Sequence, residues 1–565
     1  MIRKQLERTN VNGMYTFYAV ILYEFVAPDT ISVNKRKLMA NSRMCNVLLH
    51  PTLCAGKIVL LGLRMLRINN VQRLELVTAL LLYAAVLVYQ GYQYGQGDQS
   101  QILPCLYAQD HPGAYANDHY VSRYLESDIN ERTIFHFLLR HLGYDQPWIV
   151  FGWHVILSVT LILAWLRIAG LGIKHIGYQS LAVAAILIVG FHTSMGSNEI
   201  YYNSVIPSLA AKALGSWALY CWLRHEYNWW VILLVIAGFL QPLVGIQLFI
   251  LTFFSTTGYL LFSRKIKEFP WKHSGLYLLI SLPWLYVLHR YNGGDADPQA
   301  FMDIMEFRLS HHFFPSYFGW IHLLIGGLFA ILCLRFYKQR MLWFIIWIVV
   351  GCIAYTVGVE YYRQPVFLYT QWWKTTIWLE AFAFVATAVY MERGYTLPKL
   401  FSRFQLAAPL LIVAVVCTYR LNGYIGSKPE YMLPWSTTKS DEVDISEQAG
   451  KLTPDSAVFI IPIDFTAFRW YSKRSTYVDY KAMFHQQDFL TEWYQRIQNI
   501  YAYSLKEKEA GFDINIFSTS LLEEPSSISI DYWRSIGITH ILSTAPNIKS
   551  LKLIGSNKSY SIYSL

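Results

Sequence analysis

The sequence predicts a polytopic α-helical membrane protein with about eleven transmembrane helices and a C-terminal soluble α/β domain. Of its 565 residues, 54% are hydrophobic and only 15% are charged, whereas soluble domains usually carry about 25% charged residues. Many apolar runs approach the roughly 20 residues that cross a bilayer. Lys and Arg lie mainly in short loops between these runs, which is typical of cytoplasmic loops. The net charge of +10 therefore indicates membrane topology and no nucleic-acid partner.

Apolar length predicts the spans, and the basic loops predict their orientation. The first reliable span covers residues 74–92. The others are predicted at 148–166, 178–192, 204–223, 229–262, 275–289, 320–334, 341–357, 372–390 and 406–418. Gln241 and Pro242 interrupt the long run at 229–262, so we expect two short helices there, joined as a hairpin. Such a break must be buried in protein, because its freed backbone groups need partners.

These spans divide the chain into three parts. Residues 1–64 read as a doubtful N-terminal extension, with nine Lys or Arg against three Asp or Glu, and Met65 is the expected natural start. Residues 65–422 form the transmembrane domain, with external loops at 93–146, 290–319 and 358–371. Residues 423–565 form an α/β domain on the non-cytoplasmic side.

The C-terminal domain shows strand and helix patterns in alternation. Strands are predicted at 457–463, 476–480 and 538–543, helices at 489–505 and 528–536, and a hairpin at 552–565. Gly537 is the expected stop of the second helix.

Asp98 is the first candidate catalytic residue. It directly follows the first span, and Gly95 and Gly97 permit tight turns and close approach of a ligand. A general base must reach within about 3 Å of the hydroxyl that it deprotonates, so it needs a fixed site at the membrane surface. The alternative is a solvated loop carboxylate.

Asp118 is the second acid of the same loop. It is also well placed to cap a helix that begins near His119. A further helix is predicted from Asn130 to Leu142, with Ile134, Phe137 and Leu138 on one side. That apolar stripe either packs on the spans or lies along the membrane and contacts a lipid substrate.

Cationic side chains follow on the same external side. Arg308, His311 and His312 are candidates for binding phosphate or pyrophosphate through charge-assisted hydrogen bonds; the two histidines are equally well explained as local caps. Arg363 and Lys374 come from the third external loop, although Lys374 also fits a snorkelling lysine.

Lys212 lies inside a predicted span, where a charge is costly and is by default a functional candidate. Glu380 is its natural counter-charge in the membrane. The sequence has no Cys/His cluster with zinc spacing and no phosphate-cradling loop, so neither ATP nor GTP is expected as a direct substrate. No cofactor is certain, and the requirement for a divalent cation stays open.

The layout resembles the C-type membrane glycosyltransferases, the GT-C superfamily. The segments RLSHHFFP at 308–315, TPDSAVFIIP at 453–462, FR at 468–469 and VDYK at 478–481 are similar to a bacterial branch of it. The early acid of the family matches Asp98, so the resemblance implies that Asp98 is the catalytic base. Gln99 stands where the mannosyltransferases have a second acid. Lys374 stands where the Trp-Trp-Asp motif of the oligosaccharyltransferases has its acid. These departures argue against those subfamilies' substrates.

The resemblance implies a bacterial inner-membrane enzyme of the cell envelope with a periplasmic C-terminal domain. It would move a sugar from a polyprenyl-phosphate or polyprenyl-pyrophosphate donor to a periplasmic glycan, lipid or protein. Asp98 would deprotonate the acceptor, and Arg308, His311, His312, Lys374 and Lys212 would stabilise the departing phosphate. The alternatives are a non-catalytic scaffold or assembly protein and, third, a transporter, although paired interrupted segments in two related halves are not evident.

Overall fold

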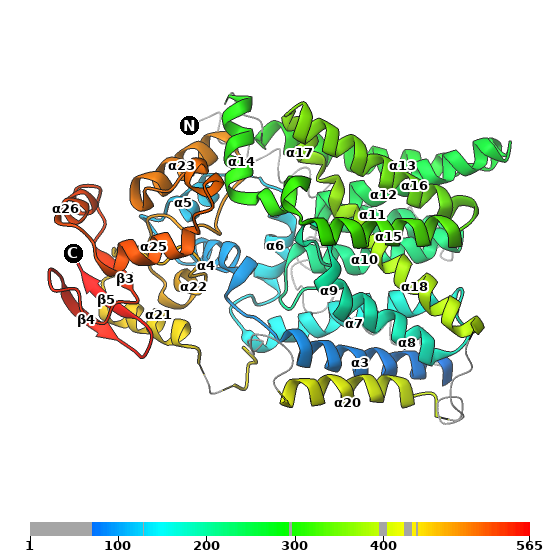
Figure 1. The fold of residues 1–565 in the computed structure, drawn as a ribbon, viewed down its shortest axis with the longest axis horizontal. Helices are drawn as coiled ribbons and strands as arrows, with labels where there is room; N and C mark the ends of the chain where they lie inside the picture. The colour runs from blue at the N-terminus through cyan, green and yellow to red at the C-terminus, as the bar shows by residue number, and fades with distance from the viewer. Residues whose placement is uncertain (1–69, 128, 293–296, 395–403, 423–431, 437–438) are drawn as a thin grey trace, which may run out of the picture. The chain divides into compact units, whose positions relative to one another are not determined.

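Helices account for most of the computed structural model, as the composition predicts (Figure 1). It describes residues 70–565, except 128, 293–296, 395–403, 423–431 and 437–438. The described residues from Asn70 onwards pack as one unit. The predicted extension at 1–64 and its start at Met65 lie outside the described residues.

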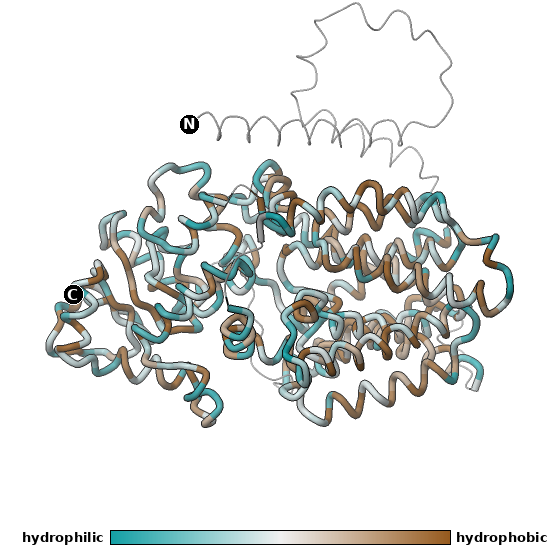
Figure 2. The backbone as a smooth tube through the Cα atoms, turned by 90° about the horizontal axis from the view of Figure 1, so that it is seen from above, coloured by the Kyte–Doolittle hydropathy of each residue, from teal (hydrophilic) through white to brown (hydrophobic). Residues whose placement is uncertain are grey.

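A helix stands at each predicted span of the described chain. They are α3 (Asn70–Gln90), α7 (Pro147–Gly170), α8 (Ile176–Ala184) with η3 (Ala185–Val189) and α9 (Gly190–Thr193), α10 (Pro207–Leu223), α11 (Tyr227–Leu240), α12 (Pro242–Phe262), α13 (Trp271–Asn292), α15 (Trp320–Phe336), α16 (Gln339–Thr356) with η7 (Val357–Tyr361), α18 (Thr376–Gly394) and α20 (Ala407–Leu421). In the described chain, five segments are long and apolar enough to cross a membrane: Asn70–Gln90, Pro147–Gly170, Ile176–Thr193, Pro242–Phe262 and Gln339–Tyr361. The protein is therefore a helical membrane protein, and the count of about eleven spans stays a prediction. The tube in Figure 2 is predominantly apolar along these helices.

The break at Gln241 separates α11 from α12, as predicted. Pro242 is the first residue of α12, where its missing N–H costs no hydrogen bond. The two helices pack closely, since a Cβ added to Gly245 would lie 2.4 Å from the Cα of Gly238. In the same bundle α10 packs on α7, α11 and α12, and α3 lies beside α20 (Figure 1).

The external loops carry short helices. The first loop holds η2 (Gly97–Gln101), α4 (Leu103–Asp110), α5 (His119–Glu126) and α6 (Thr133–His141); the second holds α14 (Pro298–Phe313), and the third holds α17 (Pro365–Thr370) and η8 (Trp372–Thr375). On α6, Phe135 and Leu139 are buried, whereas Phe137 and Leu138 are exposed. Part of the predicted stripe is therefore exposed, although Ile134 is half-buried and α6 contacts α11.

The C-terminal domain contains a five-stranded sheet in the order β2-β1-β3-β5-β4. Its strands are β1 (Val458–Ile460), β2 (Ser475–Thr476), β3 (His540–Ser543), β4 (Lys552–Ser556) and β5 (Ser561–Ser564). β1 pairs in parallel with β2 and β3, and β5 is antiparallel to β3 and β4. The helices are α21 (Asp441–Leu452), α22 (Phe468–Ser472), α23 (Gln487–Tyr501), α24 (Leu505–Glu509), α25 (Ile514–Glu523) and α26 (Ser527–Ser535). The predicted hairpin and the stop at Gly537 are present, but the strand predicted at 476–480 is mostly loop.

This domain shares one apolar core with the external loops. Tyr120 and Val121 of α5 and Phe307 of α14 belong to the same buried cluster as Trp493 of α23. Tyr120 stacks on Phe484, with ring centroids 4.5 Å apart. The C-terminal domain is thus packed against the loops that carry the candidate site.

Candidate functional site

Asp98 lies in the short helix η2, held at the end of the first span. Gly95 and Gly97 have positive φ angles of 73° and 55°, which only glycine adopts readily. Space is also limiting at Gly95, where an added Cβ would lie 2.1 Å from the Trp470 ring. The Gly97 N–H donates to Thr466 Oγ1 at 3.1 Å. The two glycines thus let this loop dock on the segment between β1 and β2.

The Asp98 carboxylate forms an ion pair with Lys481, whose Nζ lies 2.6 Å from Oδ1. Lys481 is on the loop that follows β2, at the carboxyl end of a parallel strand, where α/β sheets commonly place their functional side chains. Burial raises the pKa of Asp98, but the charge and hydrogen bond of Lys481, together with the charge of Arg132, hold this pKa below its usual value. Asp98 is therefore ionised at neutral pH, as a general base must be.

Other charges gather around this pair. Arg132 interacts electrostatically with Asp98, and Lys374 does so from η8. Arg132 is anchored beside η2 because its guanidinium donates to Gln101 Oε1 at 2.8 Å. The carboxylate thus faces cations from several separate segments of the chain.

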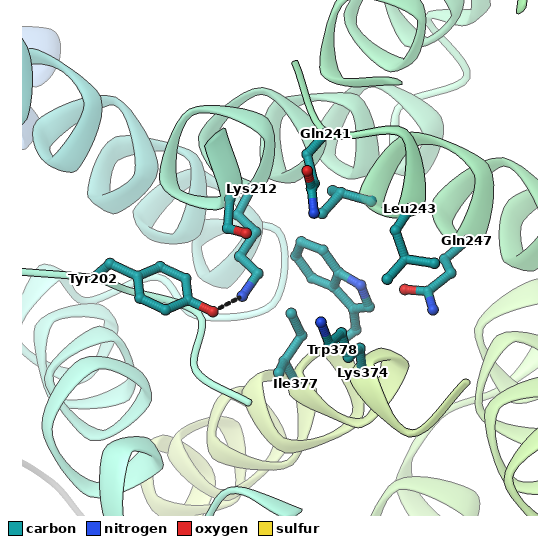
Figure 3. Close-up of a pocket in the computed structure, with 10 residues that line it drawn as sticks. Tyr202, Lys212, Gln241, Leu243, Gln247, Lys374, Ile377 and Trp378 are labelled. Carbon is teal, nitrogen blue, oxygen red and sulfur yellow. Dashed lines mark hydrogen bonds between the residues drawn. The ribbon is translucent and has the colours of Figure 1, made fainter. Parts of the chain in front are cut away.

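Lys212 and Lys374 line a pocket at the outer end of the bundle. Figure 3 shows Lys212 entering it from α10 and Lys374 from η8, with Gln241 and Gln247 also on its wall. Lys212 Nζ donates to Tyr202 Oη at 3.1 Å and to the carbonyl of Glu199. The Gln247 amide nitrogen is occupied by the carbonyls of Thr370 and Gln371, which leaves the two lysines and Gln241 as the donors suited to a phosphate.

Glu199 replaces Glu380 as the acid beside Lys212. The carboxylate of Glu380 instead accepts a hydrogen bond from Thr193, so the counter-charge predicted for Lys212 is wrong. Glu199 interacts electrostatically with Lys212, Asp98 and Lys481, and burial raises its pKa to about 7. The site thus contains a second carboxyl group, which the sequence did not single out.

Arg308 reaches the site through a bend in α14. The backbone leaves the helical conformation at Leu309, with φ −128° and ψ 27°. Lys508 donates to the freed carbonyls of Glu306 and Phe307 at 2.8 and 2.7 Å. Arg308 then lies over the Tyr480 ring, 4.3 Å from its centroid, within electrostatic range of Asp98.

The two histidines on α14 are neutral rather than cationic. Burial lowers the pKa of His312 to about 3 and that of His311 to about 4. His312 uses Nδ1 to donate to the Gly196 carbonyl at 2.7 Å. The expected positive charge from these side chains is therefore corrected: at neutral pH they contribute only as neutral polar groups.

Asp118 is fully buried and its carboxylate is occupied. Oδ1 caps α5 by accepting from the N–H groups of Tyr120 and Val121, both at 3.1 Å. Oδ2 accepts from Arg469 Nε at 2.6 Å and from the Thr476 N–H at 2.9 Å. The capping role predicted for Asp118 is confirmed, and these contacts leave it no access to an acceptor, so we no longer assign it as a base.

Arg363 is also engaged by protein acids. Its guanidinium donates to Glu306 at 2.9 Å and to Asp303 at 2.8 Å, so it ties the third external loop to α14. Paired with two carboxylates, Arg363 is not available to a phosphate, and the predicted anion contact is corrected.

Sequence reasoning missed Lys481, Glu199, Arg132 and His485 as site residues. His485 lies on the same loop as Lys481 and interacts with Arg132 and Lys374. No local pattern separates these residues from ordinary loop charges, because segments far apart in the chain bring them together.

A divalent cation does not fit this donor set. No group of three or more His, Cys, Asp or Glu side chains converges anywhere in the described chain. Asp98 is already neutralised by Lys481, and Lys374 and Arg132 add further positive charge. These side chains would repel a divalent cation, whereas they would attract an anion.

Comparisons with known proteins give one domain match. A domain of unknown function, DUF6798, matches residues 440–500. No curated protein matches the chain.

Among solved structures, the chain is similar to the Archaeoglobus fulgidus oligosaccharyltransferase tethered to an acceptor peptide, with 12% identity and a TM-score of 0.42 over 84% of this chain and 68% of that one. It is also similar to ArnT from Cupriavidus metallidurans in the apo state, with 13% identity and a TM-score of 0.38 over 86% and 96%. The structure of ArnT bound to undecaprenyl phosphate gives 13% identity and a TM-score of 0.33 over 86% of this chain and 96% of that one. With TM-scores below 0.5, these likenesses carry no argument about chemistry.

Proposed function

We propose that the protein is a membrane glycosyltransferase of the GT-C type. It transfers a sugar from a polyprenyl-phosphate or polyprenyl-pyrophosphate donor to a hydroxyl-bearing acceptor. The observation that supports this most is an ionised Asp98 beside a lysine-lined pocket at the outer end of an apolar helical bundle. The proposal places this side of a bacterial inner membrane in the periplasm, together with the C-terminal domain.

The proposed reaction uses Asp98 as the general base. Its carboxylate takes the proton of the acceptor hydroxyl as the hydroxyl oxygen bonds to the anomeric carbon of the donor. The bond from that carbon to the phosphate oxygen breaks, and the phosphate leaves with the electron pair. Lys212 and Lys374, which line the pocket, stabilise the charge that grows on this oxygen.

The polyprenyl chain of the donor would reach the pocket from the membrane. The exposed Phe137 and Leu138 on α6 give the first external loop an apolar surface for lipid. A donor carried in lipid also fits the lack of a nucleotide-binding motif in the sequence.

The direct test compares Asp98→Asn with the unchanged protein. Cells of the native host that lack the chromosomal gene express either form of the protein. The polyprenyl lipids of their membranes are then analysed by mass spectrometry. Loss of the base should cause a sugar-linked polyprenyl phosphate to accumulate and should lower transfer by about 10² to 10⁴-fold. Asp145→Asn, an exposed acid of the same loop, is the matched control and should transfer normally.

The two alternatives predict other results. A non-catalytic scaffold or assembly protein should tolerate Asp98→Asn without accumulation of donor. A transporter should leave the sugar attached to its carrier in purified vesicles whatever acceptor is supplied.

A further inference from the structure

We propose that Lys481, supplied by the C-terminal domain, is a positioning residue for Asp98: it holds Oδ1 and leaves Oδ2 for the acceptor. The C-terminal domain would then be part of the reaction centre. The inference rests on the proposed function and goes beyond it, because it assigns a role to a residue far from the external loops in sequence.

The loop that carries Lys481 is fixed on both of its flanks. Before Lys481 in the sequence, Asp479 pairs with the buried Arg469. After Lys481, the Ala482 N–H donates to Asp479 Oδ1 at 2.6 Å. Tyr480 lies between Asp479 and Lys481, and its hydroxyl donates to the Phe307 carbonyl at 3.0 Å. The backbone at Lys481 is therefore anchored to both the C-terminal domain and α14.

The segment that carries Asp98 is equally fixed. Ser100 Oγ donates to the Gly97 carbonyl at 2.7 Å, and Gln99, which is fully buried, donates to the Val205 carbonyl at 3.1 Å. Two anchored segments thus face each other, and the ion pair of Asp98 and Lys481 bridges them.

The geometry of the pair suits a base that must remain accessible. The side chains of Asp98 and Lys481 keep 42% and 35% of their exposure. In the described part of the chain no hydrogen bond to Asp98 Oδ2 is present beside the ion pair at Oδ1. A carboxylate held through one oxygen can accept the acceptor proton on the other.

Other charges around Asp98 cannot replace this contact. Arg132 comes from the segment before α6, Lys374 from η8 and Glu199 from the loop before α10, whereas Lys212 lies on α10 and Arg308 on α14. Each of them interacts with Asp98 only through space. His312, on α14, is neutral at neutral pH. Lys481 alone is in hydrogen-bonding contact with the carboxylate within the described chain.

A merely structural ion pair makes a different prediction. A half-exposed pair contributes little to stability, so its loss should leave both the fold and the chemistry of Asp98 nearly unchanged. A positioning role instead changes the protonation of Asp98 and the pH dependence of transfer.

The first test is chemical and needs no substrate. A water-soluble carbodiimide activates a carboxyl group, and an amine in contact with it forms an amide as the urea leaves. In the purified full chain, mass spectrometry should find an amide between Asp98 and Lys481. In separate samples glycine ethyl ester traps activated Asp98 across a pH series, and the midpoint of labelling reports its protonation.

The variants separate charge from shape. Lys481→Met keeps the length of the side chain without its charge, and we expect the labelling midpoint of Asp98 to move to higher pH. Lys481→Arg should restore the original midpoint. Lys451→Met, on the outside of α21, removes a lysine of the same domain as the matched control and should change nothing.

The transfer assay completes the test. Lys481→Met should lower kcat with little change in KM and should move the acid limb of the rate to higher pH, with rescue by Lys481→Arg. An unchanged labelling midpoint and no cross-link would overturn the inference. If Asp98→Asn retained transfer while the midpoint still moved, the proposed function would fail and the contact with Lys481 would stand.

Discussion

Arg469 of the C-terminal domain and Asp118 of the first external loop, 351 positions apart, form a buried ion pair with 2.6 Å between Nε and Oδ2. Their side chains are 3% and 0% exposed. Arg469 also binds Asp479, so one guanidinium joins the loop that holds Asp98 to the loop that holds Lys481.

Removing this guanidinium should destabilise the protein strongly. Arg469→Met leaves two buried carboxylates without their partner, and loss of one member of a buried pair typically costs about 3–5 kcal/mol. Thermal unfolding in detergent should therefore occur at a clearly lower temperature. Arg534→Met, which loses an exposed pair with Asp531, should change stability by at most about 1 kcal/mol. Equal effects of the two changes would contradict the buried role of Arg469.

The lysine pocket should bind a lipid phosphate. Lys212→Met and Lys374→Met each remove a charged donor, and a hydrogen bond to a charged group contributes about 1.5–3 kcal/mol. Binding of undecaprenyl phosphate, measured by native mass spectrometry in detergent, should weaken at least about tenfold in each variant. The control is Lys174→Met, in a loop that is expected to be cytoplasmic. This variant should bind undecaprenyl phosphate as the unchanged protein does. Unaltered binding in both pocket variants would place the phosphate elsewhere.

Phosphate binding should also weaken as the pH rises through about 7. Burial raises the pKa of Glu199 to about 7, so this carboxyl is neutral below that pH and negative above it. The new negative charge beside Lys212 opposes an anionic ligand. A binding series from pH 5.5 to 8.5 should show the step, and Glu199→Gln should make it smaller. A step of the same size in Glu199→Gln would assign it to another group.

The α11–α12 contact should not tolerate a side chain at Gly245. A Cβ there would lie 2.4 Å from the Cα of Gly238, and overpacking typically costs about 1–3 kcal/mol. Gly245→Ala should lower the unfolding temperature and disturb the pocket, since Gln241 and Gln247 flank this contact. Gly152→Ala, on α7 with no atom within 4 Å of its added Cβ, should be neutral or slightly stabilising.

The sequence predicts the helical part of this fold well because the bilayer imposes length and polarity on each span. The break at Gln241 and the cap at Asp118 were also predictable, since proline and N-cap residues act locally. The strand at 476–480 was overestimated: only Ser475–Thr476 pairs with β1, and the rest forms the loop that carries Lys481. Local β propensity gives no information on where pairing stops.

The candidate site was predictable only in part. Asp98, Lys374 and Lys212 stood out because charges next to or within apolar spans are costly. Arg363 and the histidines on α14 were misread, since their acidic partners and their burial depend on tertiary contacts. Lys481 could not be assigned from sequence, because its partner lies hundreds of residues earlier in the chain.

The order of strands in the C-terminal sheet bears on biosynthesis. β3 lies at the centre of the sheet and β5, which ends at Ser564, pairs directly with it. The sheet that positions Lys481 is therefore completed by a strand that follows every residue of the pocket in the sequence. Under the proposed function, a nascent chain would carry Asp98 and the donor pocket before the sheet that positions Lys481 was formed.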